Sequence, residues 1–149
     1  MIYGTLSVAK QYAEEGRIEE WMQDFLRADG KNLALADGLL KEKRYYFGLR
    51  EIPITLLSDV KSGAPEYLHK ENDIEYFFYV VEQMKEGLSN GWEAPPLIVE
   101  YVYGHFQVDD GRHRLELFRQ LGVERVWAVV WTTGEENKRT VEEILGNTD

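Results

Sequence analysis

The feature that most constrains the fold is an apolar segment near the C-terminus. Residues 125–132 have the sequence Arg-Val-Trp-Ala-Val-Val-Trp-Thr, in which valine and tryptophan predominate. A short run of β-branched and aromatic residues is typical of a buried β-strand. A strand of this kind needs other elements to pair with it and cover it, so the rest of the chain must supply them.

Three other segments are predicted to be strands. These are residues 50–57, 97–102 and 105–108. Pro53 lies inside the first segment, which indicates a sheet edge or the start of a strand because proline cannot donate a backbone hydrogen bond. The other two segments are separated by a Tyr-Gly turn.

Helical spacing of apolar residues accounts for most of the remaining chain. In residues 18–26 the apolar side chains recur at i, i+3, i+4, i+7 and i+8, which places them on one face of a helix. Shorter or similar patterns predict helices near 32–43, from Asn72 to Leu88, over 111–121 and over 135–145. Strands and helices are mixed from residue 50 onward, so the predicted class is α/β or α+β.

The chain has 149 residues, which suits one domain with a sizeable core. We expect a single domain, 1–149, made of a helical extension (1–48), a mixed core (50–132) and a C-terminal helix (133–149). The segment 1–45 is too short for a core of its own and is expected to pack on the rest.

Charge and composition exclude several classes of function. The net charge is −10, which argues against broad, salt-driven binding to a nucleic-acid backbone. The sequence contains no cysteine, so disulfides, thiolate catalysis and cysteine-ligated metals are excluded. No secretory pattern and no apolar run of membrane-spanning length is present, so we expect a cytoplasmic protein without membrane contacts.

A cationic cluster interrupts this acidic chain within residues 108–118, Val-Asp-Asp-Gly-Arg-His-Arg-Leu-Glu-Leu-Phe. On a helical wheel Arg114 falls in the middle of the apolar face, in the first turn. A buried charge must be paired, and the helix dipole disfavours a cation at this end. The remaining side chains divide into an expected buried face of Leu115, Leu117, Phe118 and Leu121 and an expected solvated face of Arg112, Glu116, Arg119 and Gln120.

An anion bound at the helix N-terminus would satisfy both requirements. Free backbone N–H groups point there, and Gly111 allows close approach of a ligand. Arg114 offers a planar fork for phosphate or carboxylate, and His113 adds further donors. The cluster therefore predicts an anion site, with phosphate as the favoured ligand. Asp109 and Asp110 are candidate ligands for a divalent cation, although two carboxylates alone do not specify one.

A purely structural interpretation stays open at this point. Asp110 is also a suitable N-cap for the helix. Arg114 is equally suited to a structural ion pair with Asp109 or with a carboxylate elsewhere in the chain.

The same segment resembles the ParB/sulfiredoxin superfamily. The resemblance covers residues 50–132 and includes the order of the elements, with Pro-Pro-Leu-Ile-Val at 95–99 and the motif Gly111-Arg112-His113-Arg114 as its most specific parts. It implies a small mixed sheet with helices and a nucleotide-phosphate site formed by Gly111, Arg112, His113 and Arg114. The implied ligands are ATP, ADP or CTP, with Mg²⁺.

Departures from the family pattern narrow what the resemblance implies. Sulfiredoxins carry their catalytic cysteine at the position of Arg112, so sulfiredoxin chemistry is excluded here. ParB proteins bind CTP through Gly-x-Arg-Arg and continue into a helix-turn-helix, which is not expected in this chain. The free-serine kinases of the superfamily have Asp-Gly-His-His-Arg, from which residues 110–114 differ at one position. A nuclease activity ranks low, because the chain offers few metal-holding carboxylates and no basic surface.

Three functions follow from these observations. The first is a nucleotide-binding protein, extended to a small-molecule phosphotransferase or a nucleoside triphosphatase in which Asp110 and His113 are the catalytic residues. The second is a non-enzymatic, nucleotide-gated module whose N-terminal helices bind a protein partner or a second copy. The third is DNA regulation with a partner that supplies the basic surface, since DNA binding by this chain alone is not expected.

Overall fold

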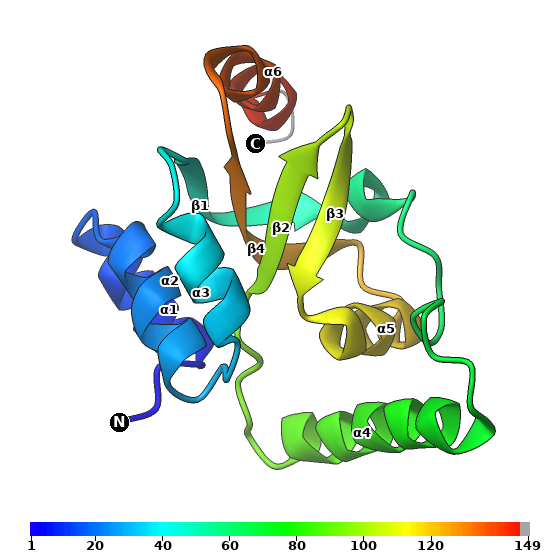
Figure 1. Cartoon of the computed structure of the whole chain (residues 1–149). Coiled ribbons are helices and arrows are strands. Elements are labelled where there is room, and N and C mark those ends of the chain that lie inside the picture. Colours follow the sequence, from blue (N-terminus) through cyan, green and yellow to red (C-terminus); the bar gives the residue numbers. More distant parts are fainter. Residues whose placement is uncertain (147–149) are drawn as a thin grey trace.

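The computed structural model describes residues 1–146 and has a four-stranded mixed sheet at its centre (Figure 1). The strand order is β1-β4-β2-β3, with β4 antiparallel to β1 and parallel to β2, and with β2 and β3 forming an antiparallel hairpin. The strands are β1 (Tyr45–Pro53), β2 (Leu97–Val102), β3 (His105–Asp110) and β4 (Arg125–Thr132). The predicted α+β class is therefore confirmed, and the apolar segment 125–132 is an interior strand.

Three N-terminal helices pack against one face of the sheet: α1 (Leu6–Glu14), α2 (Ile18–Arg27) and α3 (Leu33–Leu39). Trp21 and Phe25 of α2 stack on each other and share a core cluster with Ile98, Val129 and Trp131 of the sheet. Both aromatic side chains of α2 are buried, so this packing leaves them unavailable to a partner.

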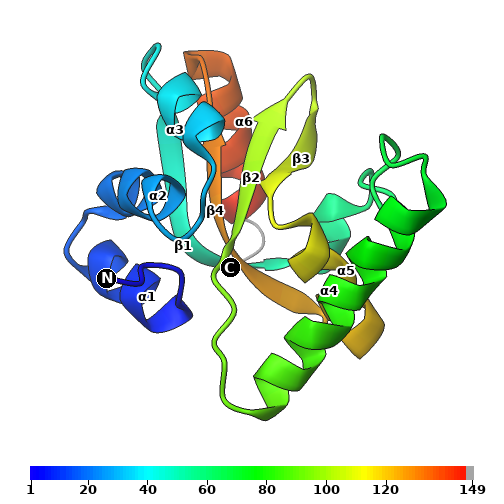
Figure 2. The same cartoon turned by 60° about the horizontal axis from the view of Figure 1, so that its bottom comes forward.

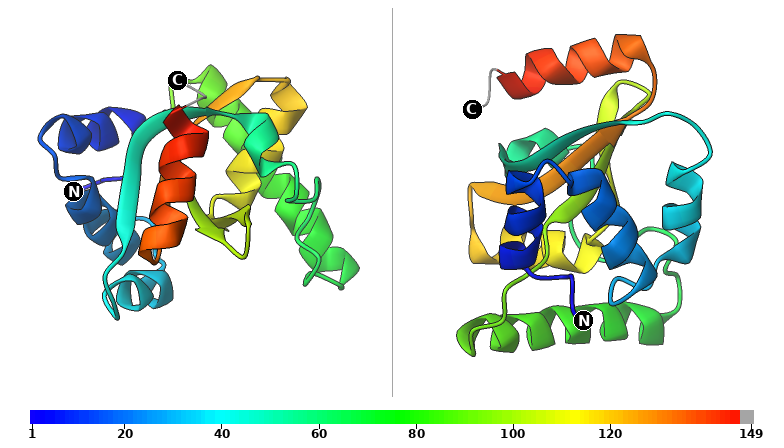
Figure 3. Two further views of the ribbon diagram at one scale, coloured as in Figure 1. Left: turned by 90° about the horizontal axis from the view of Figure 1, so that it is seen from above. Right: turned by 90° about the vertical axis from the view of Figure 1, so that its left-hand side faces the viewer.

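The opposite face of the sheet is covered by α5 (Arg112–Leu121), α6 (Glu135–Gly146) and a 3₁₀ turn, η1 (Ile54–Leu57). The longest helix, α4 (Glu71–Ser89), packs on α5 through Phe77, Val81 and Leu117. It forms an outer layer beyond α5, at the bottom of Figure 1 and of the right-hand view in Figure 3. None of the helices described in residues 1–146 combines the length and apolar character needed to cross a bilayer.

The sequence placed the first strand incorrectly. Residues 50–57 were predicted to be a strand, but β1 starts at Tyr45 and ends at Pro53, and residues 54–57 form η1. Pro53, which has no N–H to donate, is the last residue of the strand and pairs with Arg125; Ile54 N donates to Glu124 O at 2.9 Å as the chain turns into η1. The predicted boundary between a helical extension and a mixed core thus falls inside one strand.

The predicted solvated and buried faces of α5 also need correction. Arg119 Nη2 donates to the carbonyl oxygens of Leu57 and Val60, at 2.9 and 2.8 Å, and Arg112 Nη2 donates to Lys61 O at 3.2 Å. Segment 57–63 therefore covers the side of α5 that was expected to face solvent. Conversely Leu121, expected to be buried, is 49% exposed because it lies in the last turn, next to the left-handed Gly122 where the chain turns away.

Candidate functional site at the start of α5

The site is built where β3 ends and α5 begins, a transition visible in Figures 1 and 2. Between them Gly111 has a φ of 116°, in the region that favours glycine. A Cβ at this position would lie 2.6 Å from Leu97 Cδ2 and 2.9 Å from Arg114 Nη2. Leu97 and Arg114 therefore use the space that the missing side chain leaves, and the close approach of a ligand to Gly111 stays a prediction.

The start of α5 differs from the other helix starts in residues 1–146. The helices α2, α4 and α6 have acidic residues in their first turns, and α1 and α3 are capped by the side chains of Thr5 and Asn32. Among the described residues, no side chain caps α5, and its first turn carries Arg112, His113 and Arg114 instead of acidic residues. The N–H groups at this end of α5 therefore have neither a capping side chain nor a first-turn carboxylate as a partner.

A hollow of about 430 Å³ opens at this helix start. Residues 109–113 form one wall, and Tyr67, Asp73 and Phe77 contribute to the others. The hollow thus brings together Asp109, Asp110, Gly111, Arg112 and His113, as the sequence predicted, but Arg114 does not line it. Its volume exceeds that of a single phosphate and lies within the range of small-ligand sites.

His113 forms part of an aromatic wall of this hollow. Its ring stacks on Phe77 with centroids 4.4 Å apart and an angle of 26° between the planes. Burial, followed by the positive charge of Arg114, lowers the pKa of His113, with Asp110 acting in the opposite direction. The packing therefore favours the neutral imidazole, which can donate from one nitrogen and accept at the other.

Arg114 is buried, with 8% of its surface exposed, and its guanidinium is held by the protein. Its Nη2 donates to Asp110 Oδ2 at 3.1 Å and to Pro96 O at 3.3 Å. Within residues 1–146 the buried Nε has no hydrogen-bond partner. Burial lowers the pKa of Arg114 and the charge of Asp110 counteracts this.

These contacts decide the structural alternatives left open by the sequence. The partner of Arg114 is Asp110 and not Asp109. Asp110 therefore serves as the counter-ion of Arg114 and does not cap α5, whose N-cap residue is Gly111. Arg114 instead borders a second hollow of about 270 Å³, together with Asp110, Asp29 and Trp92.

Asp109 belongs to a different network on the sheet. Its Oδ2 accepts a hydrogen bond from Trp131 Nε1 at 2.9 Å, and its Oδ1 accepts one from Gln107 Nε2 at 3.1 Å. The same Gln107 nitrogen donates to Glu100 Oε1 at 3.1 Å. Burial raises the pKa of Asp109 to about 6, and burial together with the charge of Asp109 raises the pKa of Glu100 to about 6.

Sequence reasoning missed Glu100, Gln107 and Trp131 as members of this network. One signal was present, because Glu100 interrupts an otherwise apolar strand. Gln107 lies beside Glu100 because β2 and β3 pair across the hairpin, and Trp131 lies nearby because β4 is the neighbouring strand. The sequence alone does not determine either pairing.

The expected metal site has only partial support. Asp109 and Asp110 are adjacent, yet their carboxylates are engaged by different partners. Residues 1–146 contain no group of three or more carboxylate or imidazole side chains arranged to hold a metal ion. Asp73 adds a third carboxylate to the walls of the hollow.

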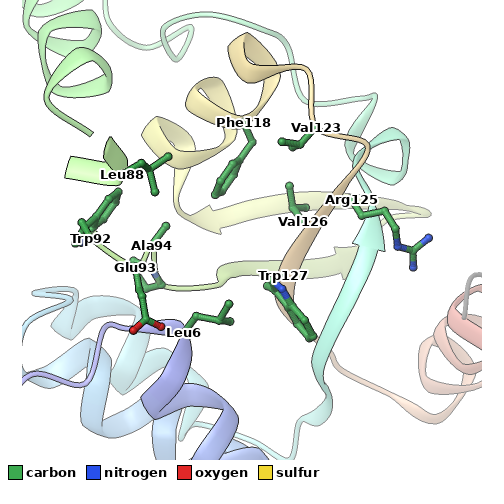
Figure 4. Close-up of a pocket in the computed structure, with 11 residues that line it drawn as sticks. Leu6, Leu88, Trp92, Glu93, Ala94, Phe118, Val123, Arg125, Val126 and Trp127 are labelled. Atoms are coloured by element: carbon green, nitrogen blue, oxygen red, sulfur yellow. The ribbon is translucent and has the colours of Figure 1, made fainter. Parts of the chain in front are cut away.

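Another concavity, shown in Figure 4, has a different character. This cavity of about 220 Å³ is lined mainly by apolar side chains, including Trp92, Phe118 and Trp127. The Glu93 carboxylate at its edge accepts hydrogen bonds from the backbone and hydroxyl of Ser7, at 3.0 and 2.6 Å. The Arg125 guanidinium points away from the cavity and donates to Glu51 O at 2.7 Å.

Comparison with known proteins adds no further constraint: no protein-family model and no curated protein matches the chain. The resemblance to the ParB/sulfiredoxin superfamily therefore stays a prediction, and the functional argument depends on the site itself.

Proposed function

We propose that this protein binds a nucleotide through its phosphate groups at the N-terminus of α5. The observation that carries the proposal is the start of α5, where a cationic first turn without a side-chain cap opens into a hollow of about 430 Å³. A helix N-terminus supplies aligned N–H donors and a positive dipole end, which together suit phosphate oxygens.

Each residue of the motif has a distinct part in this proposal. The backbone N–H groups of Arg112 and His113 are the donors to phosphate. The Arg112 guanidinium adds a positive charge to the wall of the hollow, and the neutral His113 ring adds a hydrogen-bond donor. Arg114 does not line the hollow and acts indirectly: it neutralises the Asp110 carboxylate, which would otherwise repel the phosphate. Tyr67, which is 76% exposed at the edge of the hollow, offers an aromatic surface on which a base can stack.

Mg²⁺ fits the oxygen donors of this hollow. Mg²⁺ is commonly held by one or two carboxylates together with phosphate oxygens and water, so a complete cage of protein ligands is not required. Asp109 and Asp110, which line the hollow, would each offer a carboxylate oxygen to it beside the phosphate oxygens, since residues 1–146 contain no set of three such side chains arranged for a metal ion. When bound, Mg²⁺ would supply charge neutralisation between these carboxylates and the phosphates.

Phosphoryl transfer to a small hydroxyl-bearing molecule is the second candidate. The observation that favours it is the position of Asp109 in the hollow: burial raises the pKa of this carboxyl to about 6, and the neutral His113 lines the same hollow. Asp110, predicted as a catalytic residue, is held by Arg114, which supports Asp109 as the group that would accept the hydroxyl proton.

Isothermal titration calorimetry with ATP, ADP, CTP, GTP and pyrophosphate, each with and without Mg²⁺, tests the proposal. We expect Arg112→Gln to weaken binding of the best ligand by about tenfold, because a charge-assisted contact is lost. The matched control is Arg139→Gln, which removes the same charge from the exposed side of α6.

Three results would count against nucleotide binding: no heat with any ligand, equal losses in both variants, or no loss in either. Product analysis by phosphorus NMR with small polyols and hydroxy amino acids as acceptors then separates transfer from binding alone. Nucleotide binding without a phosphorylated product, and without release of inorganic phosphate, would leave the non-enzymatic nucleotide-gated function.

A further inference from the structure

The outer side of α4 has an arrangement that the proposed nucleotide site does not use. This helix is 19 residues long, and its buried residues Phe77 and Val81 face α5. Figures 1 and 2 show it as the outermost element on its side of the molecule. Its other side therefore has no covering element within residues 1–146.

Two parallel rows of side chains run along that outer side. Tyr76, Val80, Gln83 and Gly87 form a neutral row at i, i+4, i+7 and i+11. The second row has the same spacing and is mainly acidic, with Glu75, Tyr79, Glu82 and Glu86. The rings of Tyr76 and Tyr79 stack across the two rows, with centroids 6.1 Å apart, and these side chains are 65% and 57% exposed.

The neutral row leads into a hollow at the C-terminal half of α4. This hollow of about 350 Å³ is lined by Val80, Gln83, Met84, Gly87 and Trp92. Trp92 packs closely on Gly87, where a Cβ would lie 3.3 Å from Trp92 Cβ, and both residues line the hollow. The surface therefore offers an apolar hollow, two exposed tyrosines and a flanking row of carboxylates.

We infer that this surface binds a basic amphipathic segment of a partner protein, with apolar side chains in the hollow and Lys or Arg side chains along the acidic row. The negative charge of this surface indicates that its partner is basic. The acidic row carries Glu75, Glu82 and Glu86, in a chain with a net charge of −10, and Lys85, the one lysine of the helix, donates to Glu82 at 2.9 Å. Cations gain from both the carboxylates and the faces of the tyrosine rings, and a helix of this length can align with a partner helix over about 28 Å.

The same charges disfavour other occupants. In a symmetric pair of copies the two acidic rows would lie close together, where like charges oppose association. An anionic lipid surface would be repelled for the same reason.

A synthetic peptide tests this inference with the full chain. The probe is a fluorescein-labelled helix of Leu and Lys, about 18 residues long, with Leu on one face and Lys on the other. Two control peptides have the same Leu pattern with Glu in place of Lys, and the same composition in scrambled order. We expect fluorescence anisotropy to show binding of the amphipathic basic peptide and no binding of the two controls.

Two pairs of variants separate a specific surface from general attraction by an acidic protein. Glu75→Gln/Glu86→Gln changes the acidic row of α4, and Glu136→Gln/Glu143→Gln makes the same charge change on α6. We expect the α4 pair to weaken binding by about fivefold and the α6 pair to leave it nearly unchanged. Val80→Gln, which makes the hollow polar without altering charge, is also expected to weaken binding.

Several results would overturn the inference. These are failure to bind the basic amphipathic peptide, equal weakening by the α4 and α6 pairs, and equal binding of the scrambled peptide. Sedimentation showing a dimer that Val80→Gln dissociates would assign the surface to a second copy instead. None of these results depends on nucleotide binding at α5.

Discussion

Replacement of Asp109 by asparagine should stabilise the protein, and should do so far more at neutral pH than in acid. Asp109 has its pKa raised from 3.8 to about 6, chiefly because the carboxylate is buried. The folded state therefore holds the proton of this group more tightly than the unfolded state does. The contribution of protonated Asp109 to the free energy of unfolding is therefore fully present below about pH 4 and is lost as the pH rises through about 6.

The expected size of this stability change follows from the pKa shift of Asp109. A difference of about two pKa units corresponds to about 3 kcal/mol of unfolding free energy between the protonated and ionised forms. Asparagine keeps an oxygen that can accept from Trp131 or Gln107 and carries no charge to desolvate. We therefore expect the stability difference between Asp109→Asn and the wild type to rise by about 2–3 kcal/mol between pH 4 and pH 7.5.

Urea unfolding followed by circular dichroism at both pH values measures this difference directly. Glu100 contributes in the same direction, because its pKa is raised in part by the charge of Asp109. Asp59→Asn, at an exposed position, is the matched control and should show no comparable pH dependence. The reasoning is refuted if Asp109→Asn alters stability equally at the two pH values, or destabilises the protein at pH 7.5.

Two further predictions concern the arginines of α5. Arg114→Met should lower the free energy of unfolding by about 3–5 kcal/mol, because it leaves the Asp110 carboxylate without its buried counter-ion. The double variant Arg114→Met/Asp110→Asn should regain much of that loss. Urea unfolding of both single variants and the double variant measures this, and a double-variant loss equal to the sum of the two single losses would contradict it. Arg119→Ala should cost about 1–3 kcal/mol, since its guanidinium donates to the carbonyls of Leu57 and Val60; an unchanged melting curve would instead favour the solvated position expected from the sequence.

The sequence was most informative where a pattern is local. The valine- and tryptophan-rich run of 125–132 identified an interior strand, and the helical spacing after Gly111 located α5 with an arginine on its inner face. Both depend on neighbours within a few residues, so periodicity and turn residues suffice to find them.

The features that could not be predicted from the sequence depend on contacts between residues far apart in the chain. Residues 57–63 cover the side of α5 that carries Arg119, and this depends on how a loop from another part of the chain is placed. Likewise, Asp109 meets Glu100 and Trp131 only through the order of three strands. The choice of Asp110 as the counter-ion of Arg114 was left open for the same reason, since two adjacent aspartates were equally available in the sequence.

The most direct test of the central claim is a titration of the ¹⁵N-labelled protein with the best nucleotide, followed by amide NMR spectra. Phosphate binding at the start of α5 predicts that the backbone amides of Arg112, His113 and Arg114 shift most, together with Gly111, in a saturable manner. The amide signals at the start of α6, where Glu135 and Glu136 occupy the first turn, should not shift. Saturable binding with its largest shifts elsewhere, and with the first-turn amides of α5 unmoved, would contradict the account.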